Sequence, residues 1–232
     1  APPLPDRNMR RSVIPKTEHF QACPQSIRFV RSLDACRRRA YLKVMTIRPI
    51  IEVPDKRLKT VSQPVAEVTD DTRALMDDML DTMYDANGIG LAAIQVGVAD
   101  RVIVMDISRR EQWHGATEDD PEEADTGETG PRFFVNPEIV WVSEETRNYQ
   151  EGCLSVPGFY DDVARPAQCR VAFLDYDGKT QELACDGLLA TCIQHEMDHL
   201  EGIVFLDRLS RLKRQMVLKK IAKAERDTAR AE

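Results

Sequence analysis

The stretch IQHEMDHLEGIVF, residues 193–205, decides how the rest of the chain is interpreted. It places His195 and His199 four residues apart, with Glu196 directly after the first histidine. On an α-helix, residues four apart project from the same side, so both imidazoles can bind one metal ion. Glu196 would then lie close enough to a water molecule at that ion to accept its proton. The stretch therefore predicts a metal-binding helix of a hydrolase.

A catalytic metal site needs a third protein ligand and one open position. In one class of zinc endopeptidase that ligand is a histidine six residues after the second, but Phe205 occupies this position. In another it is a glutamate further downstream, and Glu225 is the candidate, although it belongs to a lysine-rich terminal segment that is typical of a protein surface. An endopeptidase remains the alternative function.

A better third ligand lies upstream, in Glu151-Gly152-Cys153-Leu154-Ser155. By itself Cys153 is typical of an ordinary buried thiol. As a thiolate beside the histidine helix, it would complete a Cys-His-His set that suits Zn(II) and also Fe(II). The pairing with the histidines favours the metal-binding interpretation.

A third segment, Gly88-Ile89-Gly90-Leu91-Ala92-Ala93-Ile94-Gln95, combines glycines with small residues and one amide. It is no dinucleotide-binding fingerprint, because the glycine spacing differs and a predicted helix precedes it. The segment could be a simple turn between helices. Its functional interpretation is a strand-like edge that pairs with an extended peptide, with Gln95 donating an N–H to an oxyanion.

The remaining pattern predicts an α+β fold, with small β-sheets around a central metal-binding helix and a C-terminal helix. Thr69 or Asp70 can cap a helix that ends near Asn87-Gly88 and has one apolar face, formed by Leu75, Met76, Met79, Leu80 and Met83. Asp177-Gly178 predicts a hairpin turn, and Asp186 can cap the histidine helix. Strands are predicted for residues 101–107, 133–142, 170–176 and 180–185, and a last helix from about Asp207.

Composition limits the class of protein. The chain has 232 residues, 42% hydrophobic and 31% charged, which is typical of a globular protein. It contains no apolar run long enough for a membrane span or a signal peptide, so no membrane partner is expected. Its six cysteines form no C-x-x-C pair, which argues against a disulfide framework and favours a reducing compartment. The net charge of -7 combines two basic ends, residues 1–44 and 207–232, with a strongly acidic middle, which disfavours direct DNA binding by the core.

Three regions surround or interrupt the predicted catalytic domain, residues 45–206. Residues 1–44 are rich in arginine and lack a sustained hydrophobic period. They are interpreted as a transit peptide, a disordered extension, or sequence upstream of a true start at Met45, and the change of composition at Met45 favours the last. An acidic, glycine-containing loop at about residues 109–132, which includes His114, is predicted to be solvated. Residues 207–232 are predicted to form a basic C-terminal helix.

Taken together, three segments resemble the signature motifs of the bacterial, iron-dependent peptide deformylase family. They are Gly88 to Gln95, EGCLS at 151–155 and QHEMDH at 194–199, in that order along the chain. The resemblance extends from about Met45 to the terminal helix. It implies a hydrolase that removes the N-terminal formyl group from formyl-methionyl nascent polypeptides and releases formate.

The resemblance also implies a role for individual residues. Cys153, His195 and His199 would bind one divalent metal, natively Fe(II), with Zn(II), Ni(II) or Co(II) tolerated by the same ligands. Glu196 would carry the proton, and Gln95 with the backbone N–H of Leu154 would hold the oxyanion. The peptide would make backbone contacts with Ile89, Gly90 and Gly152. Its methionine side chain would lie among Ile89, Leu188, Thr191, Cys192 and His195. Glu151 would pair with Arg165 and brace the cysteine loop.

Two further features concern partners. Gly158-Phe159-Tyr160 stands where some members of the family carry charged residues. The contacts with substrate residues beyond the methionine are therefore expected to differ. The terminal helix, with its lysines and Arg214, resembles an extension by which some bacterial deformylases dock on the ribosome. The expected location is the bacterial cytoplasm, or an organelle if residues 1–44 are a transit peptide. A non-enzymatic binder of N-terminal peptides is a third alternative, which the intact Glu196 disfavours.

Overall fold

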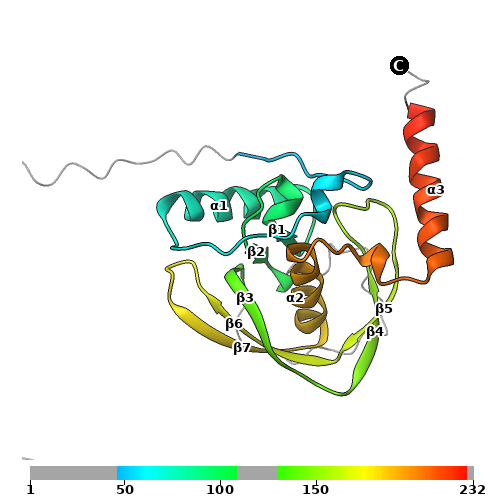
Figure 1. The fold of residues 1–232 in the computed structure, drawn as a ribbon. Coiled ribbons are helices and arrows are strands. Elements are labelled where there is room, and N and C mark those ends of the chain that lie inside the picture. The colour runs from blue at the N-terminus through cyan, green and yellow to red at the C-terminus, as the bar shows by residue number, and fades with distance from the viewer. Residues whose placement is uncertain (1–45, 109–129, 229–232) are drawn as a thin grey trace, which may run out of the picture. The chain divides into compact units, whose positions relative to one another are not determined.

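The structure, a computed structural model, describes residues 46–108 and 130–228. Its elements are two β-sheets, three α-helices and short 3-10 turns (Figure 1). The five-stranded sheet has the order β1-β2-β3-β6-β7, and β4 pairs with β5 in a second sheet. All these pairs are antiparallel, so the α+β prediction is confirmed. The predicted extension at 1–44 and nearly all of the acidic loop lie outside the described residues.

Helix α1 (Asp70–Asp85) forms where the sequence predicts it. The Thr69 side chain accepts a hydrogen bond from the Thr72 N–H and so caps the first turn. At the other end Asn87 adopts a positive φ of 54°, the left-handed conformation predicted for this position. Four of the five predicted apolar residues are buried, namely Leu75, Met76, Met79 and Met83. They pack against one face of the larger sheet.

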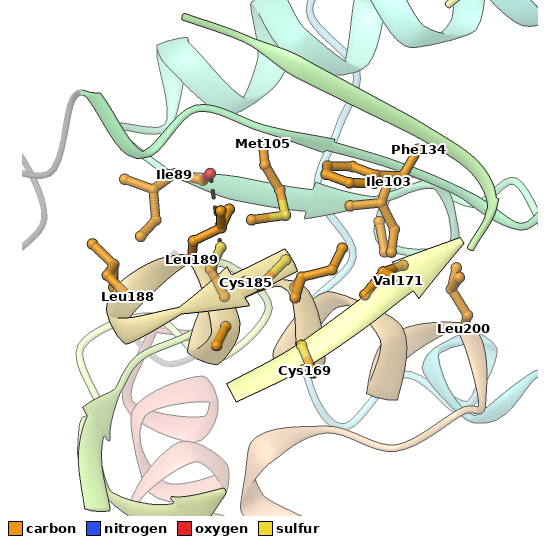
Figure 2. Packing of buried hydrophobic residues seen from close by; sticks show 14 of the residues in the cluster. Ile89, Ile103, Met105, Phe134, Cys169, Val171, Cys185, Leu188, Leu189 and Leu200 are labelled. Carbon is orange, nitrogen blue, oxygen red and sulfur yellow. Dashed lines mark hydrogen bonds between the residues drawn. The ribbon is translucent and has the colours of Figure 1, made fainter. Parts of the chain in front are cut away.

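Strand β2 (Val102–Met105) lies between two helices and is fully buried. Because side chains alternate along a strand, Val102 and Val104 pack with the α1 side, whereas Ile103 and Met105 pack with α2 (Gly187–Leu200). Figure 2 shows Ile103 and Met105 in the same apolar cluster as Leu188, Leu189 and Leu200. A continuous apolar run is the pattern expected of a strand with both faces covered.

The other strands of the larger sheet follow the prediction with shifted ends. They are β1 (Gly90–Ala92), β3 (Arg132–Val142), β6 (Gln168–Leu174) and β7 (Thr180–Asp186). The β6–β7 turn contains Gly178 with a positive φ of 81°. Strand β1 is an edge strand and leads into the 3-10 turn η2 (Ala93–Val96), so the alternative of a helix-to-helix turn at this place is wrong.

Two sequence predictions need correction. Asp186 is the N-cap residue of α2, but its side chain makes no capping hydrogen bond. The last helix, α3 (Arg211–Thr228), begins four residues later than predicted, because the 3-10 turn η4 (Phe205–Asp207) precedes it. Phe205 and Leu206 of this turn are buried, so the chain keeps its apolar contacts there before the helix starts.

The second sheet, β4 (Thr146–Glu151) with β5 (Asp161–Pro166), was not predicted. It stands beside α2, which contacts β5 as well as strands of the larger sheet (Figure 1). A third apolar cluster joins this region to the first described segment, to η4 and to α3. None of the helices in the described ranges combines the length and apolar character that crossing a membrane requires.

The turn after α2 generates a stability prediction. Gly202 has a φ of 71°, and an added Cβ would lie 2.6 Å from the backbone oxygen of Lys59. Gly158 also has a positive φ, of 76°, but nothing lies within 4 Å of its added Cβ. Left-handed backbone alone costs about 1–2 kcal/mol for alanine. We expect Gly158→Ala to lose roughly that much unfolding free energy in guanidinium titrations, and Gly202→Ala to lose ~1–3 kcal/mol more. Equal losses would contradict the steric argument.

Candidate active site

Helix α2 carries the predicted metal-binding histidines in a buried environment. His195, Glu196 and His199 are all buried, and the two imidazole rings lie edge to face with centroids 5.1 Å apart. The first half of the helix is mostly apolar and packs in the core, whereas the second half, from Gln194, is mostly polar and is buried as well. The same burial removes its polar side chains from water, and each of them therefore needs a partner or a ligand.

The loop after β4 brings Cys153 to the histidine pair. Its Sγ lies 3.2 Å from His199 Nε2, and the candidate ligand atoms of Cys153, His195 and His199 all lie within 4.8 Å of one another. A thiolate and two imidazoles are ligands that divalent transition metals accept. The three residues predicted as ligands thus converge from two parts of the chain.

The hydrogen bonds of the two imidazoles fit a metal ion. His195 Nδ1 lies 2.8 Å from Glu151 Oε2, which leaves the opposite ring nitrogen for a metal. Burial, with the charges of His195 and Arg165, lowers the pKa of His199 well below its usual value, which favours the neutral, metal-binding form. For His195 burial acts in the same direction, but its hydrogen bonds with Cys153 and Glu151 outweigh it and raise the pKa. Metal binding at His195 would therefore displace a proton from its imidazole ring.

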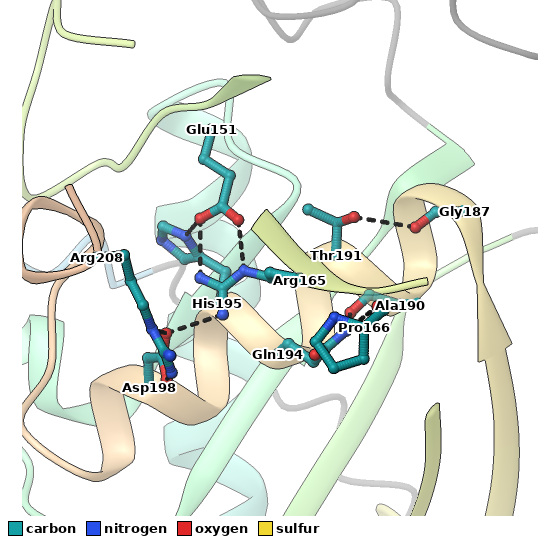
Figure 3. Close-up of polar contacts among 10 residues, drawn as sticks. All are labelled: Glu151, Arg165, Pro166, Gly187, Ala190, Thr191, Gln194, His195, Asp198 and Arg208. Carbon is teal, nitrogen blue, oxygen red and sulfur yellow. Dashed lines mark hydrogen bonds and ion pairs between the residues drawn. The ribbon is translucent and has the colours of Figure 1, made fainter. Parts of the chain in front are cut away.

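A buried ion-pair chain holds this arrangement (Figure 3). Arg165 of β5 donates to both oxygens of Glu151, with 2.9 Å from Nη2 to Oε2, so the predicted Glu151–Arg165 pair is confirmed. Its Nη1 donates to Asp198 Oδ2 at 2.9 Å, and Arg208 binds the same aspartate. Burial opposes the ionisation of Glu151, but the hydrogen bonds from Arg165 and His195 lower its pKa to about 2. A charged Glu151 therefore fixes the orientation of the His195 ring.

Glu196 is the buried carboxyl next to the candidate metal ligands. Burial raises its pKa to about 7, and its Oε2 has no hydrogen-bond partner within the described ranges. Its Oε1 lies against Gly90 of β1, where an added Cβ would collide with it and would also lie 2.9 Å from Cys192 Sγ. Only glycine at position 90 allows the strand to approach the helix this closely.

Gln95 is held in one orientation. The Ala92 N–H donates to Gln95 Oε1 at 2.8 Å, which directs Nε2 toward the cysteine loop. That nitrogen donates to Ser155 Oγ at 3.1 Å and lies 3.6 Å from Cys153 Sγ. Within the described part of the chain, the backbone N–H of Leu154 has no acceptor. Two N–H groups thus lie beside Cys153 and could hold a developing oxyanion.

A cavity of about 370 Å³ opens at this cluster. Gln95, Cys153, Leu154, His195 and Glu196 line it, whereas His199 is fully buried and does not. The predicted substrate contacts also line it: Ile89, Gly90, Gly152, Leu188, Thr191 and Cys192. A pocket of this size and mixed lining is suited to a small ligand or to the end of a peptide.

Comparison with known proteins identifies the family. The polypeptide deformylase profile matches residues 47–215. The chain belongs to the polypeptide deformylase family. It is 55% identical over 179 residues to the peptide deformylase of Phenylobacterium zucineum, which spans 77% of this chain and 97% of that protein. The peptide deformylase of Hyphomonas neptunium is 57% identical over 182 residues, 78% of this chain and 95% of that protein.

Solved deformylase structures share the fold. The crystal structure of peptide deformylase from Ehrlichia chaffeensis aligns with a TM-score of 0.70 and 41% identity, covering 79% of this chain and 99% of that one. The same enzyme in complex with actinonin gives a TM-score of 0.69 with 43% identity, over 78% and 99%. The family resemblance seen in the sequence is thereby confirmed. This deformylase is a metal-dependent hydrolase that removes the formyl group from formylmethionyl peptides and releases formate.

Several residues that line the cavity or support the side chains around it are not predicted from the sequence. Ile50 and Glu52 line it from the first described segment, and Ser155 receives the Gln95 hydrogen bond. Asp198 anchors Arg165 from within the histidine stretch. The available signal is the polar Glu52 between the apolar Ile51 and Val53, but an alternating pattern does not show which cavity the polar side chain borders.

The ion-pair chain generates the second prediction. Arg165→Met would leave the carboxylates of Glu151 and Asp198 buried without their shared cation, so we expect a loss of about 3–5 kcal/mol in unfolding free energy. Lys179→Met, which removes an exposed pair with Asp177, is the matched control and should change the transition very little. Chemical denaturation of both variants measures the difference. An Arg165→Met variant with the unfolding free energy of the native protein would contradict a stabilising role of these buried ion pairs.

Proposed function

We propose that deformylation at this site is divided among the residues that the cavity brings together. Cys153, His195 and His199 hold the metal, Glu196 moves the proton, and Gln95 with the Leu154 N–H binds the carbonyl oxygen. The observation that carries the proposal is the convergence of three candidate ligand atoms within 4.8 Å beside a buried carboxylate with an unpaired oxygen. When bound, a divalent metal supplies a Lewis acid and makes water more acidic.

Glu196 acts as the base and then as the acid. Its Oε2 is buried and makes no hydrogen bond within the described residues, so it is free to accept a proton from the attacking water. The same oxygen then delivers this proton to the nitrogen of the leaving amine. The water oxygen bonds to the formyl carbon, and the C–N bond breaks as the amine takes the proton from Glu196, which gives formate and a peptide with a free amino-terminal methionine.

Gln95 and Leu154 stabilise the negative oxygen that develops on the formyl group. The orientation of the Gln95 amide supports this role, because the hydrogen bond from the Ala92 N–H to Oε1 directs Nε2 toward the cysteine loop, where the oxygen would lie. The backbone N–H of Leu154 has no other acceptor in the described part of the chain, so it can bind the same oxygen. Removal of one such donor typically costs about 10²–10³-fold in rate.

The substrate lies as an extended peptide along an available strand edge. Strand β1 is at the edge of the larger sheet, so backbone groups near Ile89 and Gly90 can pair with the peptide, and Gly152 borders the other side. The methionine side chain enters the part of the cavity formed by Leu188, Thr191, Cys192 and His195. A thioether packs well among these apolar and sulfur-containing groups.

We propose Fe(II) as the native metal. A Cys-His-His set also accepts Zn(II), Ni(II) and Co(II), so the ligands alone do not select one of them. Metal analysis of protein purified without oxygen identifies the ion that the chain carries.

The functional test combines metal content with formate release from formyl-Met-Ala-Ser. Metal-loaded protein should release formate, and Glu196→Gln should retain the metal but lose roughly 10²–10⁴-fold in turnover. Cys153→Ala should lose both metal and activity, because it removes a ligand. Cys169→Ala, at a buried thiol outside the cavity, and Glu201→Gln, an exposed acid just after α2, are the controls.

Each alternative makes a different prediction in this assay. An endopeptidase would keep its metal and activity in Cys153→Ala. A non-enzymatic binder of N-terminal peptides would bind formyl-Met-Ala-Ser without releasing formate. Formate release that persists at the native rate in Glu196→Gln would overturn the assigned proton path.

We infer that α3 docks on the ribosome. One side of α3 packs on the third apolar cluster through Val217, Leu218 and Ile221, while Lys219 and Lys223 are exposed. Exposed lysines on a docked helix are suited to an RNA surface, whose phosphates they would neutralise. This partner supports a location where nascent chains begin with formylmethionine, which is the bacterial cytoplasm, or an organelle if residues 1–44 are a transit peptide.

Co-sedimentation with ribosomes tests this inference. We expect the double variant Lys219→Glu/Lys223→Glu to reduce the bound fraction, and added salt to reduce binding of the native chain. Lys179→Glu changes an exposed lysine in the β6–β7 turn and should bind like the native chain. Undiminished binding of the α3 double variant would exclude this surface.

A further inference from the structure

The rim segment, residues 157–160, borders the cavity with little backbone support. All of its residues line the cavity, and the chain leaves it at Asp161, the first residue of β5. The backbone groups of Gly158 and Phe159 make no hydrogen bond with another described residue. Backbone without such bonds opens more easily than the strands and helices around it. The position of the rim segment therefore depends on its side chains.

The two aromatic side chains of the rim segment have different neighbours. The Tyr160 ring fills the space that a Cβ at Gly152 would occupy, so it lies directly on the backbone of the cysteine loop. Phe159 packs against the third apolar cluster, to which α3 also contributes side chains. The rim segment thus connects the cysteine loop, which carries a candidate metal ligand, with the C-terminal helix.

Two lysines of α3 contact the rim segment and its exit. Lys220 Nζ lies over the Phe159 ring, 6.0 Å from its centroid. Lys213 Nζ pairs with Asp161 Oδ1 at 2.5 Å, directly after the rim segment. Neither lysine lines the cavity. Each contact is modest at an exposed site, but both act on residues next to Tyr160. The helix can therefore influence the position of Tyr160 without touching a substrate.

We propose that Lys213 and Lys220 are positioning residues of the active site: they keep Tyr160 against Gly152, and so hold the rim segment where it contacts the substrate residues after the methionine. The inference rests on the proposed function, because it assumes that the peptide leaves the cavity past the rim segment. The lysines act on substrate binding and not on proton transfer at Glu196. Their loss therefore raises KM and leaves kcat nearly unchanged.

Kinetics of the metal-loaded full chain test the proposal. The lysine double variant, Lys213→Met/Lys220→Met, removes both cations and keeps apolar side chains of similar length. We expect its KM for formyl-Met-Ala-Ser to rise about 3- to 10-fold, the combined size of one exposed ion pair and one cation–π contact. The amide of formylmethionine has no residue after the methionine, so its KM should not change.

Two further variants assign the effect to these contacts. Lys213→Arg/Lys220→Arg keeps a cation at both positions and should have a KM near that of the native chain, since arginine also binds carboxylates and aromatic rings. Arg211→Met/Arg226→Met removes the same charge from α3 at two exposed residues that make no ion pair with the described residues. Its KM should equal that of the native chain. A folding defect would lower kcat as well.

Chymotrypsin measures the position of the rim segment independently of catalysis. It cuts after aromatic residues, so opening of the rim segment exposes the bonds after Phe159 and Tyr160. Where opening is fast, the cutting rate follows the population of the open form. The lysine double variant should therefore be cut there about 3- to 10-fold faster than the native chain. Mass spectrometry of the fragments identifies the bond.

The outcomes separate this inference from the proposed function. If the native chain hydrolyses formyl-Met-Ala-Ser but the lysine double variant keeps the native KM, or is cut no faster by chymotrypsin, the inference is overturned and the function stands. An equal rise in KM for the amide of formylmethionine, or in Arg211→Met/Arg226→Met, also overturns it. If the native chain does not hydrolyse formyl-Met-Ala-Ser, the proposed function fails and the inference fails with it.

Discussion

The carboxylate of Glu151 is the interaction on which the site depends. It lies at the end of β4, two residues before Cys153, and binds Arg165 of β5 and the ring of His195 on α2. One charged group thus joins the second sheet, the cysteine loop and the central helix. Because it is buried, losing either partner would leave the Glu151 charge only partly compensated in an apolar environment, so the contacts hold the three segments in a single arrangement.

The larger sheet gives this arrangement its rigidity. Its central strands are covered by α1 on one face and by α2 on the other, so α2 is surrounded by apolar contacts along most of its length. Catalytic geometry needs side chains that do not change rotamer, and a close-packed helix provides them. Gly90 adds a local requirement, because β1 approaches Glu196 at a distance that excludes any side chain.

Elements whose own residues carry a clear pattern are predictable from this sequence, whereas elements that depend on a neighbouring segment are not. The cap and the apolar face predict helix α1, and the β-branched residues predict β2. The β4–β5 hairpin was missed, because many of its side chains are exposed and its polar sequence shows no buried face. The start of α3 was misplaced, because burial of Phe205 and Leu206 interrupts the helix before Arg211.

The sequence by itself determined the chemistry of this protein: two histidines and a glutamate at helical spacing, one cysteine between glycine and leucine, and three motifs that together indicate deformylation. These are properties of residue type and spacing, which need no neighbours to be read. Only the tertiary structure decided that Asp198 completes the bracing of His195 through Arg165, and that Glu52 lies in the cavity wall. Such roles arise from contacts between distant segments, and the packing that creates these contacts is set by the whole core.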